Sequence, residues 1–179
     1  MRVKDCCAVS WLLDIKNILC YNKIMCRFKR TTIGKPEQWL IEAAASIGLD
    51  YSQLTHEITN HFQSHVIKRH GQGILAITEK DYEKIPDIVK SPDMAVIGAV
   101  REGTLINAYA KRETGATYLY FEEVLDSNRN KALRGRTFFK IIKKIDMKNF
   151  ERIITMNKIT DLSKAKKIAA GGYPGGEAW

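Results

Sequence analysis

The change of hydrophobic period at Ser91-Pro92-Asp93 constrains the fold of this chain more than any other feature. Before it, apolar residues recur at helical spacing. After it, short runs rich in β-branched and aromatic residues follow one another. The separators Arg101-Glu102-Gly103 and Glu113-Thr114-Gly115 predict hairpin turns between these runs. Helices followed by an antiparallel meander predict an α+β fold, with N-terminal helices packed on an antiparallel sheet of four strands or slightly more.

The same patterns predict the individual elements. Expected helices cover 8–26, 36–47, 50–69, 81–89 and 161–169, and Thr78 is expected to cap the fourth with Asp81 three residues on. Expected strands cover 94–100, 104–112, 117–125, 136–144 and 150–159, with helix as the alternative for 136–144 and a bend at Gly135. Residues 31–36 are read as a strand or a linker.

These elements suggest three parts of the chain. Residues 1–30 form an N-terminal amphipathic extension, and residues 31–160 form the α+β domain. Residues 161–179 form a short basic helix and a flexible Gly-rich tail. A chain of 179 residues can bury the core of one medium domain, and a second full domain is not expected.

The net charge of +9 is unevenly distributed along the chain. Residues 1–36 carry +6, residues 37–130 carry −5 and residues 131–169 carry +9. If the two basic ends fold onto one face, they form a surface that suits a polyanion. The alternative is a solvated face that keeps the protein in solution.

All cysteines lie near the N-terminus, at Cys6, Cys7, Cys20 and Cys26. No pair has CxxC spacing, so a zinc site is not expected, and reduced thiols or two local disulfides remain as alternatives. No apolar run approaches the ~20 residues of a membrane span. We therefore expect a cytoplasmic protein, with delivery into a target cell as an alternative, and no contact with a membrane.

The segment SHVIKRHG, Ser64–Gly71, holds the most telling group of polar residues. It sets His65 and His70 around Lys68 and Arg69 and contains no acid. Metal-free cleavage of RNA needs groups that exchange protons near neutral pH and cations that balance the charge of the phosphorane. This cluster supplies both, and the alternative is an ordinary basic helix end.

A metal site in this region is not expected. His61 and His65 are four residues apart and share a helix face. No Cys, Asp or Glu close in sequence completes a ligand set, and Lys68 and Arg69 would repel a cation. We therefore expect neither a metal ion nor another cofactor.

The strands offer further candidates. Tyr109 and Lys111 lie on one face of their strand by period-two alternation, and Lys111 either guards an edge or contacts a phosphate. Arg101 lies at a turn. Thr137 and Lys140 either face a phosphate from the two sides of a bend or decorate an exposed strand.

The order of these features resembles the phage-encoded branch of the ribonuclease superfamily that unites barnase, EndoU, certain colicins and RelE-type toxins. The resemblance rests on HVIKRHG, ITEKDYEKIPDIVKSPD, a strand with YAK, TYLYFEEV and RGRTFFK, and covers roughly Ile33 to Lys140. It implies a nuclease domain of phage-associated or polymorphic toxins, built from N-terminal helices on a four-stranded antiparallel sheet.

The resemblance also implies the site. The expected catalytic residues are His65, His70, Lys111, Thr137 and Lys140. The expected substrate-binding residues are Lys68, Arg69, Arg101, Tyr109 and Arg136. On a regular helix the offset of five residues turns His70 about 140° away from His65. Either the helix ends before His70, which we expect, or only one of the two histidines is catalytic.

The resulting hypothesis is a metal-independent endoribonuclease, a toxin or effector that cleaves by attack of the 2′-hydroxyl and leaves a 2′,3′-cyclic phosphate. Its partners would be RNA, with tRNA and mRNA as alternative substrates, and a cognate immunity or antitoxin protein. The alternatives from other classes are a non-catalytic nucleic-acid-binding module and a phage assembly protein.

Overall fold

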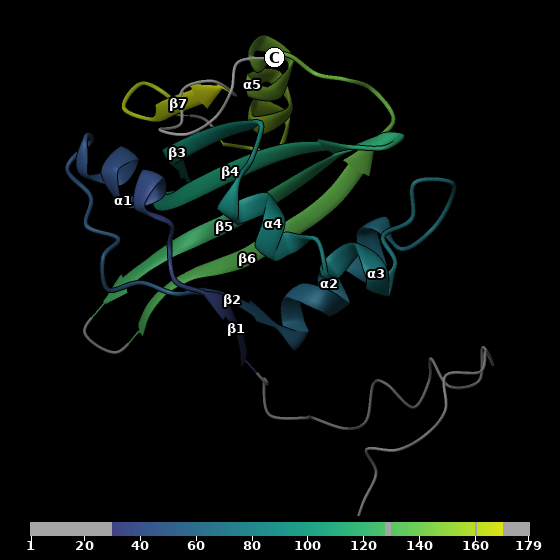
Figure 1. Cartoon of the computed structure of the whole chain (residues 1–179), viewed down its shortest axis with the longest axis horizontal. Helices are drawn as coiled ribbons and strands as arrows, with labels where there is room; N and C mark the ends of the chain where they lie inside the picture. Colours follow the sequence, from purple (N-terminus) through teal and green to yellow (C-terminus); the bar gives the residue numbers. More distant parts are fainter. Residues whose placement is uncertain (1–29, 128–129, 160, 170–179) are drawn as a thin grey trace, which may run out of the picture.

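The computed structural model describes residues 30–127, 130–159 and 161–169 (Figure 1). The expected helix over 8–26, the cysteines and the Gly-rich tail lie outside these residues, so the structure does not test them. Within the described ranges the α+β class is confirmed.

The described strands form one mixed sheet in the order β1-β2-β6-β5-β4-β3-β7. Their bounds are β1 Arg30–Gly34, β2 His56–Thr59, β3 Met94–Arg101, β4 Thr104–Glu113, β5 Ala116–Ser127, β6 Asn130–Ile141 and β7 Lys166–Ala169. The meander β3 to β6 is antiparallel as expected, but β2 pairs parallel to β6. The expected four-stranded antiparallel sheet is therefore too small and not fully antiparallel, because the short strands β1, β2 and β7 add to its two edges.

Helices pack on both faces of the sheet (Figure 1). Their bounds are α1 Gln38–Ala45, α2 Asn60–His70, α3 Glu79–Tyr82, α4 Ile85–Lys90 and α5 Met147–Met156. The helices α1 and α4 bury apolar residues on one face, and α5 covers the other, so the helices are not only N-terminal. Within the described part of the chain, none of the helices has the length and apolar composition to cross a membrane.

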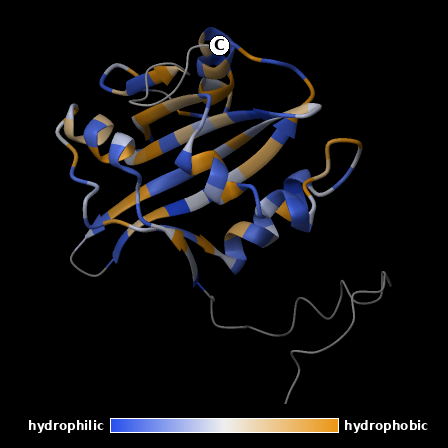
Figure 2. Cartoon of the chain, in the orientation of Figure 1, coloured by the Kyte–Doolittle hydropathy of each residue, from blue (hydrophilic) through white to orange (hydrophobic). Residues whose placement is uncertain are grey.

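Period-two alternation of the strands builds a separate apolar core on each face (Figure 2). Tyr109, Tyr120 and Phe138 point to the side that we call the α1/α4 face. Ala108 and Phe121 point to the other side, the α5 face. Neighbouring residues of one strand therefore belong to different surfaces.

Three expected elements are wrong, and the single helix expected over 81–89 is divided into α3 and α4. The segment read as one helix over 50–69 contains β2 followed by α2, because His56 and Glu57 pair with β6 and Thr59 Oγ1 then accepts a hydrogen bond from the Phe62 N–H. The expected strand over 150–159 is mostly α5, capped by Asp146. The expected helix over 161–169 contains β7, which pairs with β3.

Other local signals are confirmed. The helix after Pro36 forms as α1, and residues 31–36 are largely strand β1. Thr78 and Asp81 make the expected capping box. The two hairpin turns contain backbone with positive φ at Glu102, Gly103 and Gly115, which suits tight turns between twisted strands.

A buried polar network joins the centre of the sheet to its β2 edge. Glu122 of β5 is fully buried and binds the Tyr109 hydroxyl, His56 Nδ1 at 2.9 Å and Asn107 Nδ2 at 3.3 Å. Asn107 Oδ1 in turn accepts hydrogen bonds from the Tyr51 hydroxyl at 3.0 Å and from the backbone N–H of Gly98 at 3.1 Å. Buried polar groups cost free energy when they lack partners, so this network selects one pairing of the strands.

We predict that Asn107→Ala lowers the free energy of unfolding by about 2–4 kcal/mol, because it leaves two buried donors and one carboxylate oxygen with fewer partners. Urea denaturation of wild type and variant measures the change. Gln53→Ala, at an exposed position, is the control and should change stability by less than about 0.5 kcal/mol. Equal stability of Asn107→Ala and the control would show that the network does not hold the strands.

Candidate functional site

Helix α2 lies along the part of β6 that β2 leaves open. Strand β2 pairs with β6 only at Leu133 and Arg134, and the chain then enters α2. Phe62 and Val66 of α2 are buried on the α1/α4 face, where the Phe62 ring meets Tyr120 edge-on at 6.0 Å. The remaining side chains of α2 are left toward solvent and toward the α5 face.

A β-bulge in β6 lies opposite this helix. Glu122 pairs with Gly135 and Phe121 pairs with Thr137, so Arg136 is the extra residue. A Cβ atom on Gly135 would lie 2.9 Å from the Tyr120 hydroxyl oxygen and 3.2 Å from Phe62, so glycine lets α2 approach. The expected bend at Gly135 is confirmed in this form.

The bulge directs side chains of β6 to the α5 face. Arg136 Nη1 lies 3.4 Å from Glu123 Oε2 and is about half exposed. Glu123 follows Phe121 by two residues, and Thr137 pairs with Phe121, so period-two alternation puts both on the α5 face. Arg136, Thr137 and Glu123 therefore border the same surface.

His70 reaches this surface through a stack of aromatic rings. The His70 ring stacks on Phe139 at 5.2 Å, and Phe139 stacks on Phe121 at 5.9 Å. The helix includes His70 as its last residue, with Gly71 as the C-cap, so the expectation that it ends before His70 is wrong. The contact with Phe139 places the ring instead.

His65 lies among several cations. Burial lowers the pKa of His65, and the charges of Arg69, His61, Arg136 and Arg101 lower it further. Arg69 belongs to α2, Arg136 to β6 and Arg101 to the end of β3, so three elements converge on one imidazole. Among the described residues, the buried Nε of Arg101 has no hydrogen-bond partner.

The pKa of His70 is also lowered, first by burial and then by the charges of His65 and Arg69. Both imidazoles are therefore mostly neutral near pH 7 and can accept a proton. We call His65, His70, Arg69, Arg101, Arg136 and Thr137 the His65 surface. Lys68 is exposed on α2 beside it.

Lys111 and Tyr109 lie away from the His65 surface. Lys111 Nζ donates to the carbonyls of Asp87 and Ser91, at 3.2 and 2.9 Å, and to Ser91 Oγ at 2.7 Å. These groups form the C-terminal end of α4, on the α1/α4 face. Tyr109 is completely buried in the Glu122 network.

Lys140 also lies on the α1/α4 face. Lys140 Nζ is 3.0 Å from Asp81 Oδ2 and lies over the ring of Tyr118. Burial raises the pKa of Asp81, but hydrogen bonds from Thr78, Tyr118 and Lys140 outweigh it and bring the pKa to about 2. Lys140 and Thr137 therefore serve opposite sides of β6.

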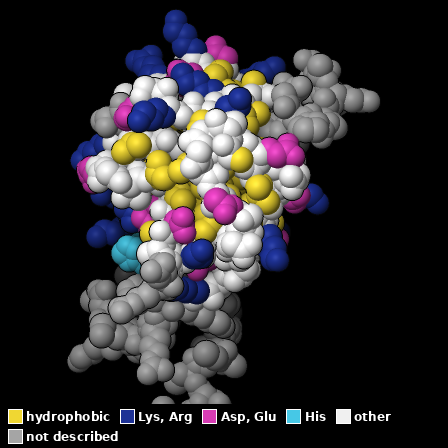
Figure 3. Space-filling model, turned by 90° about the vertical axis from the view of Figure 1, so that its left-hand side faces the viewer, with side chains coloured by type: hydrophobic (Ala, Val, Ile, Leu, Met, Phe, Trp, Pro, Cys, Tyr) yellow, Lys and Arg dark blue, Asp and Glu magenta, His cyan; other side chains and the backbone are white. Residues whose placement is uncertain are grey.

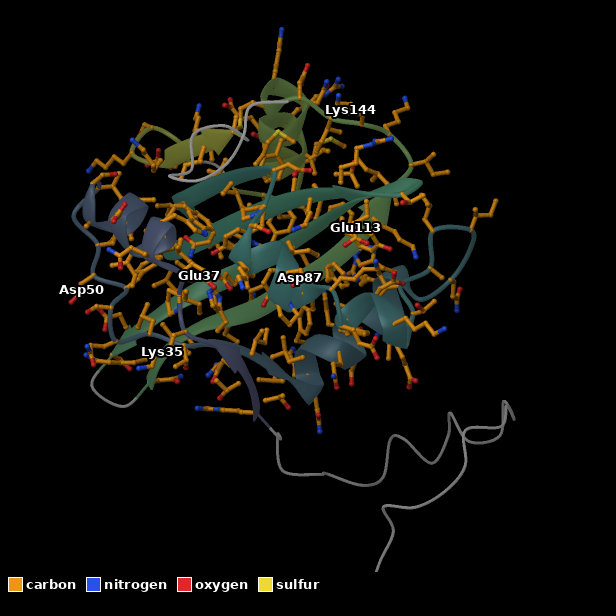
Figure 4. All side chains as sticks on the ribbon, in the orientation of Figure 1. Lys35, Glu37, Asp50, Asp87, Glu113 and Lys144 are labelled. Carbon is orange, nitrogen blue, oxygen red and sulfur yellow. The ribbon has the colours of Figure 1, made fainter. Side chains whose placement is uncertain are left out.

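The same cluster holds a second lysine. Lys84 pairs with Glu113, which Figure 4 labels near the right-hand ends of the strands. Lys84 also lies over the ring of Tyr118. Both lysines of this cluster thus have carboxylate partners within the protein.

The sequence did not indicate that Phe139 and Glu123 belong to the site. Phe139 orients His70, and alternation from Thr137 places it on the correct face. Glu123 binds Arg136. In the described ranges no group of three or more His, Cys, Asp or Glu residues could hold a metal ion.

Comparison with known proteins gives one match. The family described as "phage-Barnase-EndoU-ColicinE5/D-RelE like nuclease3" matches residues 34–165. This range begins at Gly34, the last residue of β1, and includes α2, the strands β3 to β6 and α5. No curated protein and no solved structure matches the chain.

We predict that Arg69→Gln raises the pKa values of both His65 and His70, because the charge of Arg69 lowers both. NMR titration of the histidine ring protons measures each value. Lys68→Gln removes the neighbouring charge, which does not contribute to either shift, and serves as the matched control. Similar shifts in the two variants would mean that Arg69 is not specifically close to the imidazoles.

Proposed function

We propose that this chain, which belongs to the phage-Barnase-EndoU-ColicinE5/D-RelE like nuclease family, cleaves RNA without a metal ion by attack of a 2′-hydroxyl on the adjacent phosphorus. The observation that carries the proposal is the position of His65 beside Arg69, Arg101 and Arg136. Cleavage of a phosphodiester uses both kinds of group: guanidinium groups bind the phosphate, and a neutral imidazole accepts a proton.

The two histidines divide the proton transfers. His65, with more cations around it, accepts the proton of the 2′-hydroxyl while the 2′-oxygen forms its bond to phosphorus. The bond from phosphorus to the 5′-oxygen breaks, and protonated His70 gives its proton to that oxygen. The products are a 2′,3′-cyclic phosphate and a 5′-hydroxyl. After the reaction His65 is protonated and His70 is neutral.

The arginines balance the charge that develops on the phosphorane. Arg101 has a buried Nε–H without a partner among the described residues, and a phosphate oxygen would satisfy it. Arg136 is half exposed, and Glu123 holds its guanidinium in place before substrate arrives. The Thr137 hydroxyl can add one hydrogen bond to the same phosphate.

Lys111 and Lys140 take no proton-transfer step in this proposal. Each already donates to protein oxygens on the α1/α4 face, so the proposal gives them a role in stability.

We further propose that the cleavage makes the protein a toxin or effector. The resemblance to colicin- and RelE-type nucleases supports this role, and expression of the wild-type chain should slow growth of the host cell.

We predict that His65→Ala and His70→Ala each lower the rate of RNA cleavage by about 10²-fold or more, the usual effect of losing a proton-transfer group. The assay follows a total RNA pool in EDTA and maps the cut ends. Gln72→Ala, an exposed neighbour, is the control for folding and handling.

Three outcomes would contradict the mechanism. Cleavage that stops in EDTA and returns with a divalent metal would overturn the metal-free route. Equal rates in wild type and a histidine variant would remove that histidine from the reaction. Salt-sensitive binding of RNA with no cut ends would favour the non-catalytic nucleic-acid-binding module.

We also predict that kcat/KM is greatest below pH 6.5. The rate depends on a neutral His65 and a protonated His70, and this combination is most populated between their two pKa values. Both values are lowered from 6.5 in the free protein, and kcat/KM reports the free protein. A maximum above about pH 7.5 would contradict the proposed acid–base pair.

A further inference from the structure

Lys and Arg side chains gather around α5 and β7, outside the His65 surface. The exposed members are Lys143, Lys144, Lys148, Arg152, Lys158, Lys164 and Lys167, which we call the α5–β7 basic surface. Figure 3 shows Lys and Arg collected at the upper end of the molecule, the end that α5 and β7 occupy in Figure 1.

The acids of this region, Asp146, Glu151 and Asp161, are fewer than the cations and offset only part of their charge. Asp146 Oδ1 accepts from the Asn149 N–H and caps α5, and Asp161 Oδ1 binds the N–H and hydroxyl of Ser163. Glu151 pairs with Lys167 at 2.9 Å. Within the described residues, Lys167 is the one member of the α5–β7 basic surface in an ion pair. The surface therefore keeps a strong positive potential.

Rigid elements hold the cations in place. Phe150 and Ile154 anchor one side of α5 in the core, which leaves Lys148 and Arg152, four residues apart, together on its outer side. Strand β7 pairs with β3 over four residues. Lys167 is paired with Val96 and lies on the α5 face, whereas Lys166 is paired with Ile97 and lies on the α1/α4 face. A fixed row of cations binds a regular polyanion with less loss of entropy than a mobile tail.

The α5–β7 basic surface continues toward the His65 surface. Lys143 and Lys144 follow directly after β6, and the Thr117 hydroxyl donates to the Lys143 carbonyl at 2.8 Å, which fixes this connection. Figure 4 labels Lys144 where the chain passes from β6 to α5. Between Arg136 and Lys143, the α5 face of β6 presents Thr137, Phe139 and Ile141, so cations lie at both ends of this path.

We propose that the α5–β7 basic surface binds the phosphate backbone of the same RNA that the His65 surface cleaves, which makes the preferred substrate an RNA long enough to reach both. The inference rests on the proposed function for the cleavage step. Strand β7 lies four strand spacings from β6, or about 19 Å, a length that about six base pairs of duplex cover. Structured RNA therefore fits better than a dinucleotide.

The chemistry of this surface favours phosphates over a protein partner or a membrane. Protein interfaces have an apolar centre, whereas Met156 is the one large side chain with strong apolar exposure described on α5 and β7. Membrane-surface helices likewise present Trp, Phe or Leu to the lipid, and the apolar residues of α5 are buried against the sheet.

The test compares two triple variants with the same change of charge. Lys144→Gln/Lys148→Gln/Arg152→Gln removes three cations of the α5–β7 basic surface. Lys35→Gln/Lys90→Gln/Lys131→Gln neutralises exposed cations elsewhere, and Figure 4 labels Lys35 on the opposite side of the molecule from α5. Both are measured for binding of a fluorescent stem–loop RNA across a salt series, in a His65→Ala background that slows turnover. Both are also measured for binding to anionic vesicles, and for cleavage of a dinucleotide with both histidines present.

The triple variant of the α5–β7 basic surface should raise Kd for the stem–loop by about tenfold. It should also reduce the magnitude of the slope of log K against log salt by about two to three, because each lost phosphate contact reduces that slope by about 0.7–0.9. Cleavage of the dinucleotide should not change. Equal Kd values and slopes in the two triple variants would overturn the inference. Loss of binding to anionic vesicles without loss of RNA binding would overturn it in favour of a membrane surface.

The binding arm separates this inference from the proposed function. If wild type cleaves no RNA but the surface variant still loses affinity and salt dependence, the proposed function fails and the RNA-binding surface stands. If cleavage is present and the two triple variants bind alike, the cleavage mechanism stands and the α5–β7 basic surface is not part of RNA recognition.

Discussion

The contact between His56 and Glu122 fixes the part of the structure on which the site depends. It joins β2 to the centre of the sheet at 2.9 Å, among side chains with almost no exposure to water. Strand β2 leads without a loop into α2, so this contact sets where α2 begins and how it lies along β6. The bulge at Gly135 then provides the room for the helix. The polar core of the sheet therefore positions the histidines from a distance.

The sequence supports those parts of the fold whose cause is local. The hairpins of the meander follow from turn glycines, and the Thr78–Asp81 capping box follows from a spacing of three residues. Strand β2 has no such signal, since His56-Glu-Ile-Thr59 becomes extended through pairing with β1 and with residues of β6 far along the chain. The basic segment of β7 likewise becomes a strand because the edge of β3 is open to it.

The sequence likewise predicts only those parts of the candidate site whose residues lie close together along the chain. His65, His70 and Arg69 stand close together in the sequence, and the structure keeps them together. The strand lysines could not be placed, because period-two alternation requires the register and the bulge to be known. The extra residue Arg136 shifts the alternation of β6, and so decides which face of the sheet Thr137 and Lys140 lie on. The bulge is visible only in the pairing of β6 with β5.

The parallel pairing of β2 with β6 has a consequence for synthesis of the chain. The Arg134–Glu57 contact between these strands joins residues 77 positions apart, and the charge of Arg136 acts on His65 across a similar separation. Contacts between such distant segments form late in folding. A ribosome that has released only β1 to β4 therefore carries the histidines without the strand that orients them. The His65 surface is complete only when β6 has emerged. Under the proposed function, the growing chain would therefore not cleave nearby RNA during most of its synthesis.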